Sequence, residues 1–203
     1  MKIFCIGRNY ADHAKELGNG IPDEPVIFMK PKSALVQGHT PFYYPEFTNE
    51  LHYEAELVVR ISKNGKYIPE KHASNYYNAI TVGIDFTARD IQQQLKEKGL
   101  PWEKAKSFDN SAAIGKFIDI TPKMDRKNIN FSFAKNKEIV QNDNSKSMIF
   151  SIDNIIANIS IYFSLNIGDL VFTGTPAGVG ECMVGDHLEG YFEKDLVLSL
   201  EIK

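Results

Sequence analysis

One strand-like segment constrains the fold more than any other part of the sequence. It runs from Leu51 to Ile61, and it is rich in β-branched residues toward its end. Strand-like segments outnumber helical ones, and they do not alternate regularly with helices, which favours a β-rich α+β fold over a doubly wound parallel sheet. Further strands are predicted over Lys2–Gly7, Val26–Met29, Ala79–Asp85, Leu170–Thr173 and Leu196–Ile202.

Short helices are predicted at three places. The first covers Tyr10–Leu17, and the second covers Thr87–Lys98, where Thr87 and Asp90 have the spacing of a capping box. The third follows Ser151, whose hydroxyl can cap the first turn. Its apolar residues have helical spacing and form one stripe: Ile152, Ile155, Ile156, Ile159 and Phe163.

Length and composition predict one globular domain over residues 1–203. Hydrophobic residues make up 43% of the sequence and charged residues 24%, which is ordinary for a folded protein. The formal net charge is −3 and no basic tract stands out, so a nucleic-acid partner is not expected. The longest apolar stretches fall well short of the ~20 residues that a membrane helix needs, so no membrane association is expected either.

The cysteine content predicts a cytoplasmic protein. Cys5 and Cys182 form neither a CxxC pair nor a zinc-binding spacing, which favours two reduced thiols, although a single disulfide remains an alternative. The N-terminal residues MKIFCIGRNY lack the pattern of a signal peptide.

Carboxylates lie within two of the predicted strands. Side chains two residues apart on a strand share a face and are about 6.6 Å apart, so His52, Glu54, Glu56 and Val58 are expected on one face. Asp85 ends another apolar strand. Three carboxylates suit Mg²⁺ or Mn²⁺. From spacing alone, the alternative is that both glutamates line a solvated strand face and that Asp85 is a turn residue.

Other polar residues have spacings that suit a site. His13 and Glu16 are three apart on the predicted N-terminal helix, where a carboxylate can orient an imidazole that activates water. Arg89, with Gln92 on the same side of its helix, could bind a substrate carboxylate. The Thr175 hydroxyl lies in a glycine-rich loop whose free amides could do the same. Ordinary surface residues and a tight turn remain the alternatives.

Eight segments, in order along the chain, resemble the fumarylacetoacetate hydrolase superfamily. The closest resemblance is to its single-domain acylpyruvase and oxaloacetate decarboxylase branch. The matching segments cover nearly the whole chain: Ile6–His13, Phe28–Pro31, Leu51–Leu57, Asp85–Asp90, Gly99–Trp102, Ala105–Phe108, Ser147–Phe150 and Thr173–Gly180.

The resemblance implies a fold, an assembly and a set of roles. The expected fold is a mixed β-sandwich roll with a few short helices, usually assembled as a homodimer. Metal ligands for Mg²⁺, with Mn²⁺ as a substitute, would be Glu54, Glu56 and Asp85. Catalytic residues would be His13, Glu16 and Lys106, the first two on a mobile lid. Substrate-binding residues would be Arg8, Lys30, Arg89, Gln92 and Thr175.

The expected activity is Mg²⁺-dependent cleavage of a carbon–carbon bond in a small 2-oxo or 2,4-dioxo acid. Acylpyruvate hydrolysis and oxaloacetate decarboxylation both give pyruvate through the same enolate, which a metal can stabilise. Isomerisation of a 2-hydroxy-diene dioate and keto–enol tautomerisation of oxaloacetate are alternatives. A second alternative, from a different class, is a non-catalytic metal- or ligand-binding module.

Overall fold

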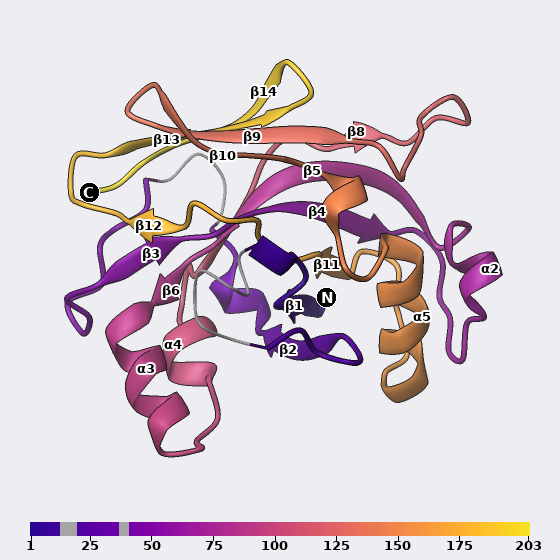
Figure 1. Cartoon of the computed structure of the whole chain (residues 1–203), viewed down its shortest axis with the longest axis horizontal. Coiled ribbons are helices and arrows are strands. Elements are labelled where there is room, and N and C mark those ends of the chain that lie inside the picture. Colours follow the sequence, from indigo (N-terminus) through magenta and orange to yellow (C-terminus); the bar gives the residue numbers. More distant parts are fainter. Residues whose placement is uncertain (13–19, 37–40) are drawn as a thin grey trace.

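The computed structural model describes residues 1–12, 20–36 and 41–203 and contains three β-sheets (Figure 1). The largest sheet has the order β2-β1-β11-β4-β5-β7, and β8 pairs with β5. Its strands are β1 (Ile3–Gly7), β2 (Val26–Lys30), β4 (Ala55–Ile61), β5 (Tyr77–Asp85), β7 (Ala112–Ile114), β8 (Ile118–Asp119) and β11 (Leu170–Phe172). Strands β1 and β11 pair parallel to each other. On the outer side of each, the pairing is antiparallel, β1 with β2 and β11 with β4.

The described residues also form two smaller sheets. The four-stranded sheet has the order β10 (Glu138–Asn144), β9 (Asn130–Lys135), β13 (His187–Phe192) and β14 (Asp195–Glu201). Figure 1 shows this sheet lying across β4 and β5. The three-stranded sheet joins β12 (Gly180–Glu181), β3 (Leu51–Tyr53) and β6 (Thr87–Ala88).

The helices are short and lie at two sides of the sheets (Figure 1). Helices α3 (Arg89–Glu97) and α4 (Glu103–Lys106) lie together at one side, and α2 (Glu70–Ala73) and α5 (Ile152–Tyr162) at the other. The described residues also form two 3₁₀ turns, η1 (Lys32–Ala34) and η2 (Ser145–Ser147). The predicted β-rich α+β roll is confirmed.

The third predicted helix forms as expected. The Ser151 hydroxyl accepts a hydrogen bond from the Asn154 amide at 3.2 Å, which caps α5. The isoleucines of its apolar stripe are at most 4% exposed and pack in the largest core cluster, which also contains Phe4 and Leu57. Burial of this stripe therefore fixes α5 against the largest sheet.

The predicted continuous strand over residues 51–61 is wrong at one residue. The strand is interrupted at Glu54, which separates β3 from β4 and places the two halves in different sheets. The Glu54 carbonyl accepts from the Asp85 amide at 2.8 Å, and the Ala55 amide donates to Gln141 Oε1 at 2.9 Å. The chain can pass from one sheet to another here because hydrogen-bond partners far along the sequence satisfy its backbone groups. Strand propensity alone could not reveal these partners.

The predicted start of the second helix is also wrong. Thr87 and Ala88 form β6, which pairs with β3, and α3 begins at Arg89. The Thr87 hydroxyl donates to the Asp85 carbonyl at 3.2 Å, and Asp90 Oδ1 accepts from the Thr48 hydroxyl at 2.5 Å. The capping box does not form because both side chains bind other partners.

Both cysteines are buried free thiols, so the disulfide alternative is wrong. Within the described residues, no helix is long and apolar enough to cross a membrane.

Candidate metal and substrate site

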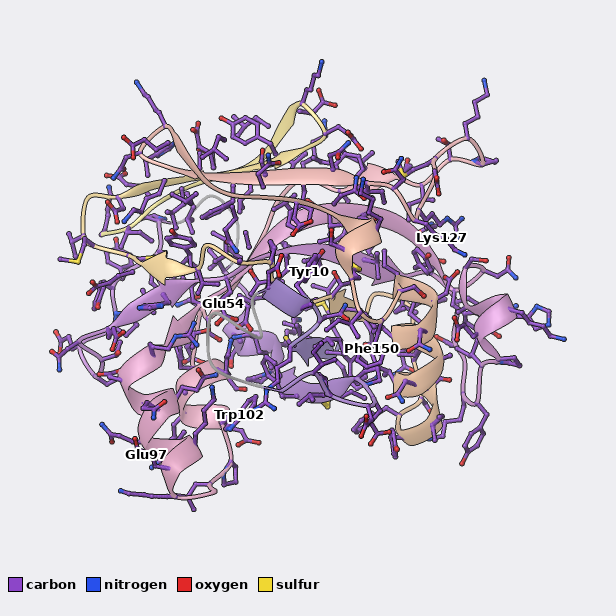
Figure 2. All side chains as sticks on the ribbon, in the orientation of Figure 1. Tyr10, Glu54, Glu97, Trp102, Lys127 and Phe150 are labelled. Carbon is purple, nitrogen blue, oxygen red and sulfur yellow. The ribbon has the colours of Figure 1, made fainter. Side chains whose placement is uncertain are left out.

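Three carboxylates converge where β3, β4 and β5 meet. Glu54 occupies the break between β3 and β4, Glu56 follows in β4, and Asp85 ends β5, which pairs antiparallel with β4. One oxygen from each carboxylate lies within 4.8 Å of the others. Figure 2 shows Glu54 inside the molecule, on the side where α3 and α4 lie. The side chains are 6%, 2% and 1% exposed, which excludes the solvated-face alternative.

Three cations surround these carboxylates. The Lys106 ammonium lies 2.6 Å from Glu54 Oε2 and 2.7 Å from Asp85 Oδ2. Arg89 Nη2 lies 2.5 Å from Glu54 Oε1, and Lys30 Nζ lies 2.8 Å from Asp85 Oδ1. Three formal negative charges thus face three formal positive charges. A bound divalent cation would leave the group with an excess of two positive charges, which suits an anionic ligand.

Lys30 contacts the carboxylate cluster at Asp85 from within the protein interior. Its side chain is 1% exposed, and its ammonium donates to the Ser111 carbonyl and hydroxyl at 3.0 Å each, as well as to the Lys106 carbonyl. The cavity that the carboxylates line does not include Lys30 among its lining residues. The structure therefore places this predicted substrate-binding residue behind Asp85 and not at the cavity surface.

Burial and charge shift the pKa values of two groups in the cluster. Burial, with a contribution from Asp85, raises the pKa of Glu56 well above its ordinary value, although the Gly174 amide, which donates to Glu56 at 2.7 Å, opposes this. Burial lowers the pKa of Lys106, but Asp85 and Glu54 outweigh it and the net pKa is raised. Lys106 therefore remains a charged ammonium, whereas its surroundings compensate the negative charge of an ionised Glu56 only poorly.

The donor set fits Mg²⁺ or Mn²⁺. Carboxylate oxygens are the hard ligands that these ions prefer. Two oxygens on opposite sides of one Mg²⁺ are about 4.2 Å apart. The 4.8 Å limit on the oxygens of Glu54, Glu56 and Asp85 is therefore compatible with one shared ion after small side-chain adjustments. A dication would also relieve the incomplete charge compensation at Glu56.

A cavity extends from the carboxylates and brings together most of the predicted substrate-binding residues. Arg8, Arg89, Gln92 and Thr175 all line it, next to Lys106. Sequence reasoning missed the other lining residues, of which four bear on its chemistry: Ile6, Phe28, Lys96 and Trp102. The helical spacing of Lys96 relative to Arg89 and Gln92 was the available signal for that residue.

Thr175 and Gln141 connect the glycine-rich loop to β4. The Thr175 hydroxyl donates to the Ala55 carbonyl at 2.8 Å and accepts from Gln141 Nε2 at 2.8 Å. Gln141 Oε1 accepts from the Ala55 amide, so one side chain ties β10 to both segments. No sequence pattern pointed to Gln141, because its partners are 34 and 86 residues away.

His13 and Glu16, the predicted catalytic pair, lie outside the described residues. The chain just before them is anchored by Asn9, which is fully buried. Asn9 Nδ2 donates to the Thr173 carbonyl at 2.7 Å and to the Phe150 carbonyl at 3.0 Å, and its Oδ1 accepts from the Phe150 amide at 2.7 Å. These bonds hold Asn9 beside the loop that supplies the Gly174 amide to Glu56.

Comparisons with known proteins assign this chain to one family. The family profile described as fumarylacetoacetate (FAA) hydrolase C-terminal matches residues 2–202. The chain is 39% identical to oxaloacetate tautomerase FAHD1, mitochondrial, of Mus musculus over 99% of this chain and 91% of that protein. It is 42% identical to the mitochondrial oxaloacetate decarboxylase of Dictyostelium discoideum over 93% of this chain and 87% of that protein.

A solved structure extends the similarity to the fold. Fumarylpyruvate hydrolase from Pseudomonas aeruginosa, in complex with Mn²⁺ and pyruvate, superposes with a TM-score of 0.93 at 36% identity. The alignment covers 100% of this chain and 89% of that one.

Proposed function

The chain belongs to the fumarylacetoacetate hydrolase family, and on that premise we propose that it is a metal-dependent enzyme acting on small 2-oxo acids. The proposed reaction is cleavage of the bond between C3 and C4 of oxaloacetate or an acylpyruvate, giving pyruvate. The observation that carries this proposal is the buried cluster of Glu54, Glu56 and Asp85, bridged by the Lys106 ammonium at 2.6 and 2.7 Å.

We propose Glu54, Glu56 and Asp85 as the metal ligands, with Mg²⁺ as the physiological ion and Mn²⁺ as a substitute. The Mn²⁺ in the Pseudomonas aeruginosa relative supports a divalent cation, and the oxygen donors of this chain support Mg²⁺ equally. When bound, the cation supplies a Lewis acid that stabilises negative charge on the 2-oxo group of the substrate.

Cationic side chains then bind and stabilise the substrate. Arg89 and Gln92, which hydrogen bond to each other at 2.6 Å, present donors at the cavity wall for the substrate carboxylate. The Lys106 ammonium is fixed by Glu54 and Asp85, so its positive charge is already in place when an enolate forms. Thr175 is proposed as a further substrate contact, because this residue lines the cavity.

For hydrolysis, we propose that His13 and Glu16 activate the attacking water. Support comes from their spacing in the sequence and from the family resemblance. Decarboxylation of oxaloacetate needs no such water, because CO₂ leaves from C4 and the same enolate results.

Tautomerisation of oxaloacetate is the second candidate function. The name of the mouse relative, oxaloacetate tautomerase, favours it. Tautomerisation requires only that the enolate be stabilised and that a proton be returned, so the same cluster could support both reactions.

We also propose that the protein is a cytoplasmic homodimer. The reduced, buried thiols of Cys5 and Cys182 support a reducing compartment, and the family resemblance supports the dimer. Light scattering after size-exclusion chromatography measures the mass directly, and a monomer would contradict the assembly.

The deciding experiment compares metal-free and metal-loaded protein across a panel of substrates. Purified protein is treated with EDTA, and turnover of oxaloacetate, acetylpyruvate and a 2-hydroxy-diene dioate is followed before and after Mg²⁺ or Mn²⁺ is returned. We expect pyruvate release only with metal. Full turnover without metal would refute the proposal, and metal binding without turnover of any substrate would favour a binding module. Enol loss without pyruvate release would identify a tautomerase.

A further inference from the structure

One face of α3 forms a wall of the cavity. Arg89, Gln92 and Lys96 lie at positions i, i+3 and i+7 and all line it. Seven helical residues span about 10 Å, so this wall runs from the carboxylate cluster at Arg89 outward to Lys96. Side chains on a helix lean toward its N-terminus, which directs Lys96 back along the cavity.

The inner cations of the cavity, Arg89 and Lys106, contact carboxylates, whereas Lys96 contacts none among the described residues. Arg89 and Lys106 contact Glu54 within 2.6 Å. In the part of the chain that the structure describes, no carboxylate lies within 4.0 Å of Lys96 Nζ. Its ammonium instead lies 5.8 Å from the centroid of the Trp102 ring, and the residue is half-buried.

Arg8 adds a second positive charge to this outer region. It is partly buried, lines the same cavity, and adopts a left-handed backbone conformation with φ of 60°. Burial, and then the charges of Arg89 and Arg8, lower the pKa of Lys96. The outer part of the cavity therefore carries positive charge that a bound anion would stabilise.

We propose that Lys96 and Arg8 form a subsite for a second, distal carboxylate of the substrate, so that dicarboxylic 2-oxo acids are preferred over monocarboxylic acylpyruvates. This inference rests on the proposed function and adds the substrate class to it. The first carboxylate and the 2-oxo group occupy the inner end near Arg89, and the distal carboxylate extends toward Lys96. Charge-assisted hydrogen bonds from two cations would distinguish a carboxylate from a methyl group.

Two other roles for Lys96 must be separated from this one. A lysine in the last turn of a helix stabilises the helix dipole, and a cation over Trp102 stabilises the fold. Both roles affect folding and leave the choice of substrate unchanged. Ile6, Phe28 and Trp102 also line the cavity, and an apolar acyl chain would favour them instead.

The experiment compares two substrates that differ in one group. Oxaloacetate carries a distal carboxylate where acetylpyruvate carries a methyl ketone. For metal-loaded Lys96→Met, we expect the ratio of kcat/KM for oxaloacetate to that for acetylpyruvate to fall about ten-fold. Lys96→Arg should retain most of the ratio, because it keeps the charge. Lys98→Met is the matched control, since Lys98 is an exposed lysine at the end of the same helix.

A ratio for Lys96→Met that stays within about two-fold of that for Lys98→Met would overturn the subsite. An equal loss on both substrates, accompanied by a lower melting temperature, would also overturn it and assign Lys96 to the fold.

A binding measurement keeps the inference testable even if the proposed reaction fails. Trp102 is the only tryptophan in the sequence and lines the cavity, so its fluorescence can report ligand binding. Mg²⁺-loaded protein is titrated with pyruvate and with 2-oxoglutarate, which adds a distal carboxylate. Weaker binding of 2-oxoglutarate alone in Lys96→Met supports the subsite, whereas unchanged affinity for both overturns it. Absent turnover of every substrate would refute only the proposed function.

Discussion

Lys30 and Lys106 contact different oxygens of Asp85, with 2.8 Å between Lys30 Nζ and Asp85 Oδ1. Lys106 Nζ lies 2.7 Å from the other oxygen of the same carboxylate. Both oxygens of Asp85 are thus held by buried ammonium groups before any ligand arrives. Such an arrangement fixes the orientation of a proposed metal ligand, in the way that neighbouring groups commonly orient metal-binding side chains.

Lys30→Met should weaken both stability and metal binding. Removing one partner of a buried ion pair leaves Asp85 uncompensated, which costs about 3 kcal/mol in the free energy of unfolding. Loss of the orienting contact should weaken Mn²⁺ binding by about 10- to 100-fold in calorimetry. Lys32→Met, at an exposed lysine of η1, is the control. Wild-type affinity in a folded Lys30→Met protein would contradict the positioning role.

Glu56 should make the stability of the metal-free protein depend on pH. Burial and Asp85 raise its pKa in the folded state, so the folded protein retains a proton that the unfolded chain has released. Below the ordinary glutamate pKa, Glu56 is protonated in both states and does not lower the free energy of unfolding. As the pH rises from that value toward the folded-state pKa, Glu56 lowers the free energy of unfolding progressively. Denaturant unfolding in EDTA should show this loss for the wild type and not for Glu56→Gln. If the unfolding free energies of the wild type and Glu56→Gln changed with pH in the same way, Glu56 would not be the group responsible.

Gly174→Ala should damage the site through the backbone. Gly174 has φ of +98°, and a Cβ there would lie 2.6 Å from Asn9 Cβ. Relieving this clash must move the amide that donates to Glu56. We expect a loss of about 2–4 kcal/mol in unfolding free energy together with weaker Mn²⁺ binding. Gly99→Ala isolates the cost of positive φ, because nothing lies within 4 Å of its Cβ position. Equal losses in both variants would exclude the clash.

His13→Ala should lower acylpyruvate hydrolysis about 100-fold or more while leaving Mn²⁺ affinity unchanged, because the proposed role is to activate water. Single-turnover assays and metal titration on the same preparation measure both quantities. Oxaloacetate decarboxylation, which needs no water, provides an internal comparison. If the variant lost its metal, His13 would be a ligand and the proposed roles would be wrong.

The two cysteines should resist modification in the folded protein. Burial raises the pKa of both thiols, and at Cys5 the Asp85 charge adds to the effect. A thiol reagent such as DTNB at pH 8 should therefore react with neither, and with both once the chain is unfolded in guanidinium chloride. Rapid reaction of the native protein would show that one of the cysteines becomes accessible.

Local patterns predicted one helix well and half of the strands, namely β1, β2, β3, β4, β5, β11 and β14. The alternation of β14 and the apolar stripe of α5 follow from a single burial direction, which the sequence records directly. Strands β9 and β10 went unpredicted because they contain many polar residues and are stabilised by pairing with distant segments. They pair with each other, and β9 also pairs with β13. The break at Glu54 was missed for a similar reason, since its partners come from β5 and β10.

The sequence by itself determined which chemical groups are present and which of them share a strand or a helix face. The spacing of Glu54 and Glu56, and the position of Asp85 at a strand end, are properties of the sequence alone. Only the tertiary structure decided that these carboxylates are buried together and matched by Lys30, Lys106 and Arg89. The physical reason is that charge compensation and desolvation depend on distances between segments far apart along the chain, which local spacing does not specify.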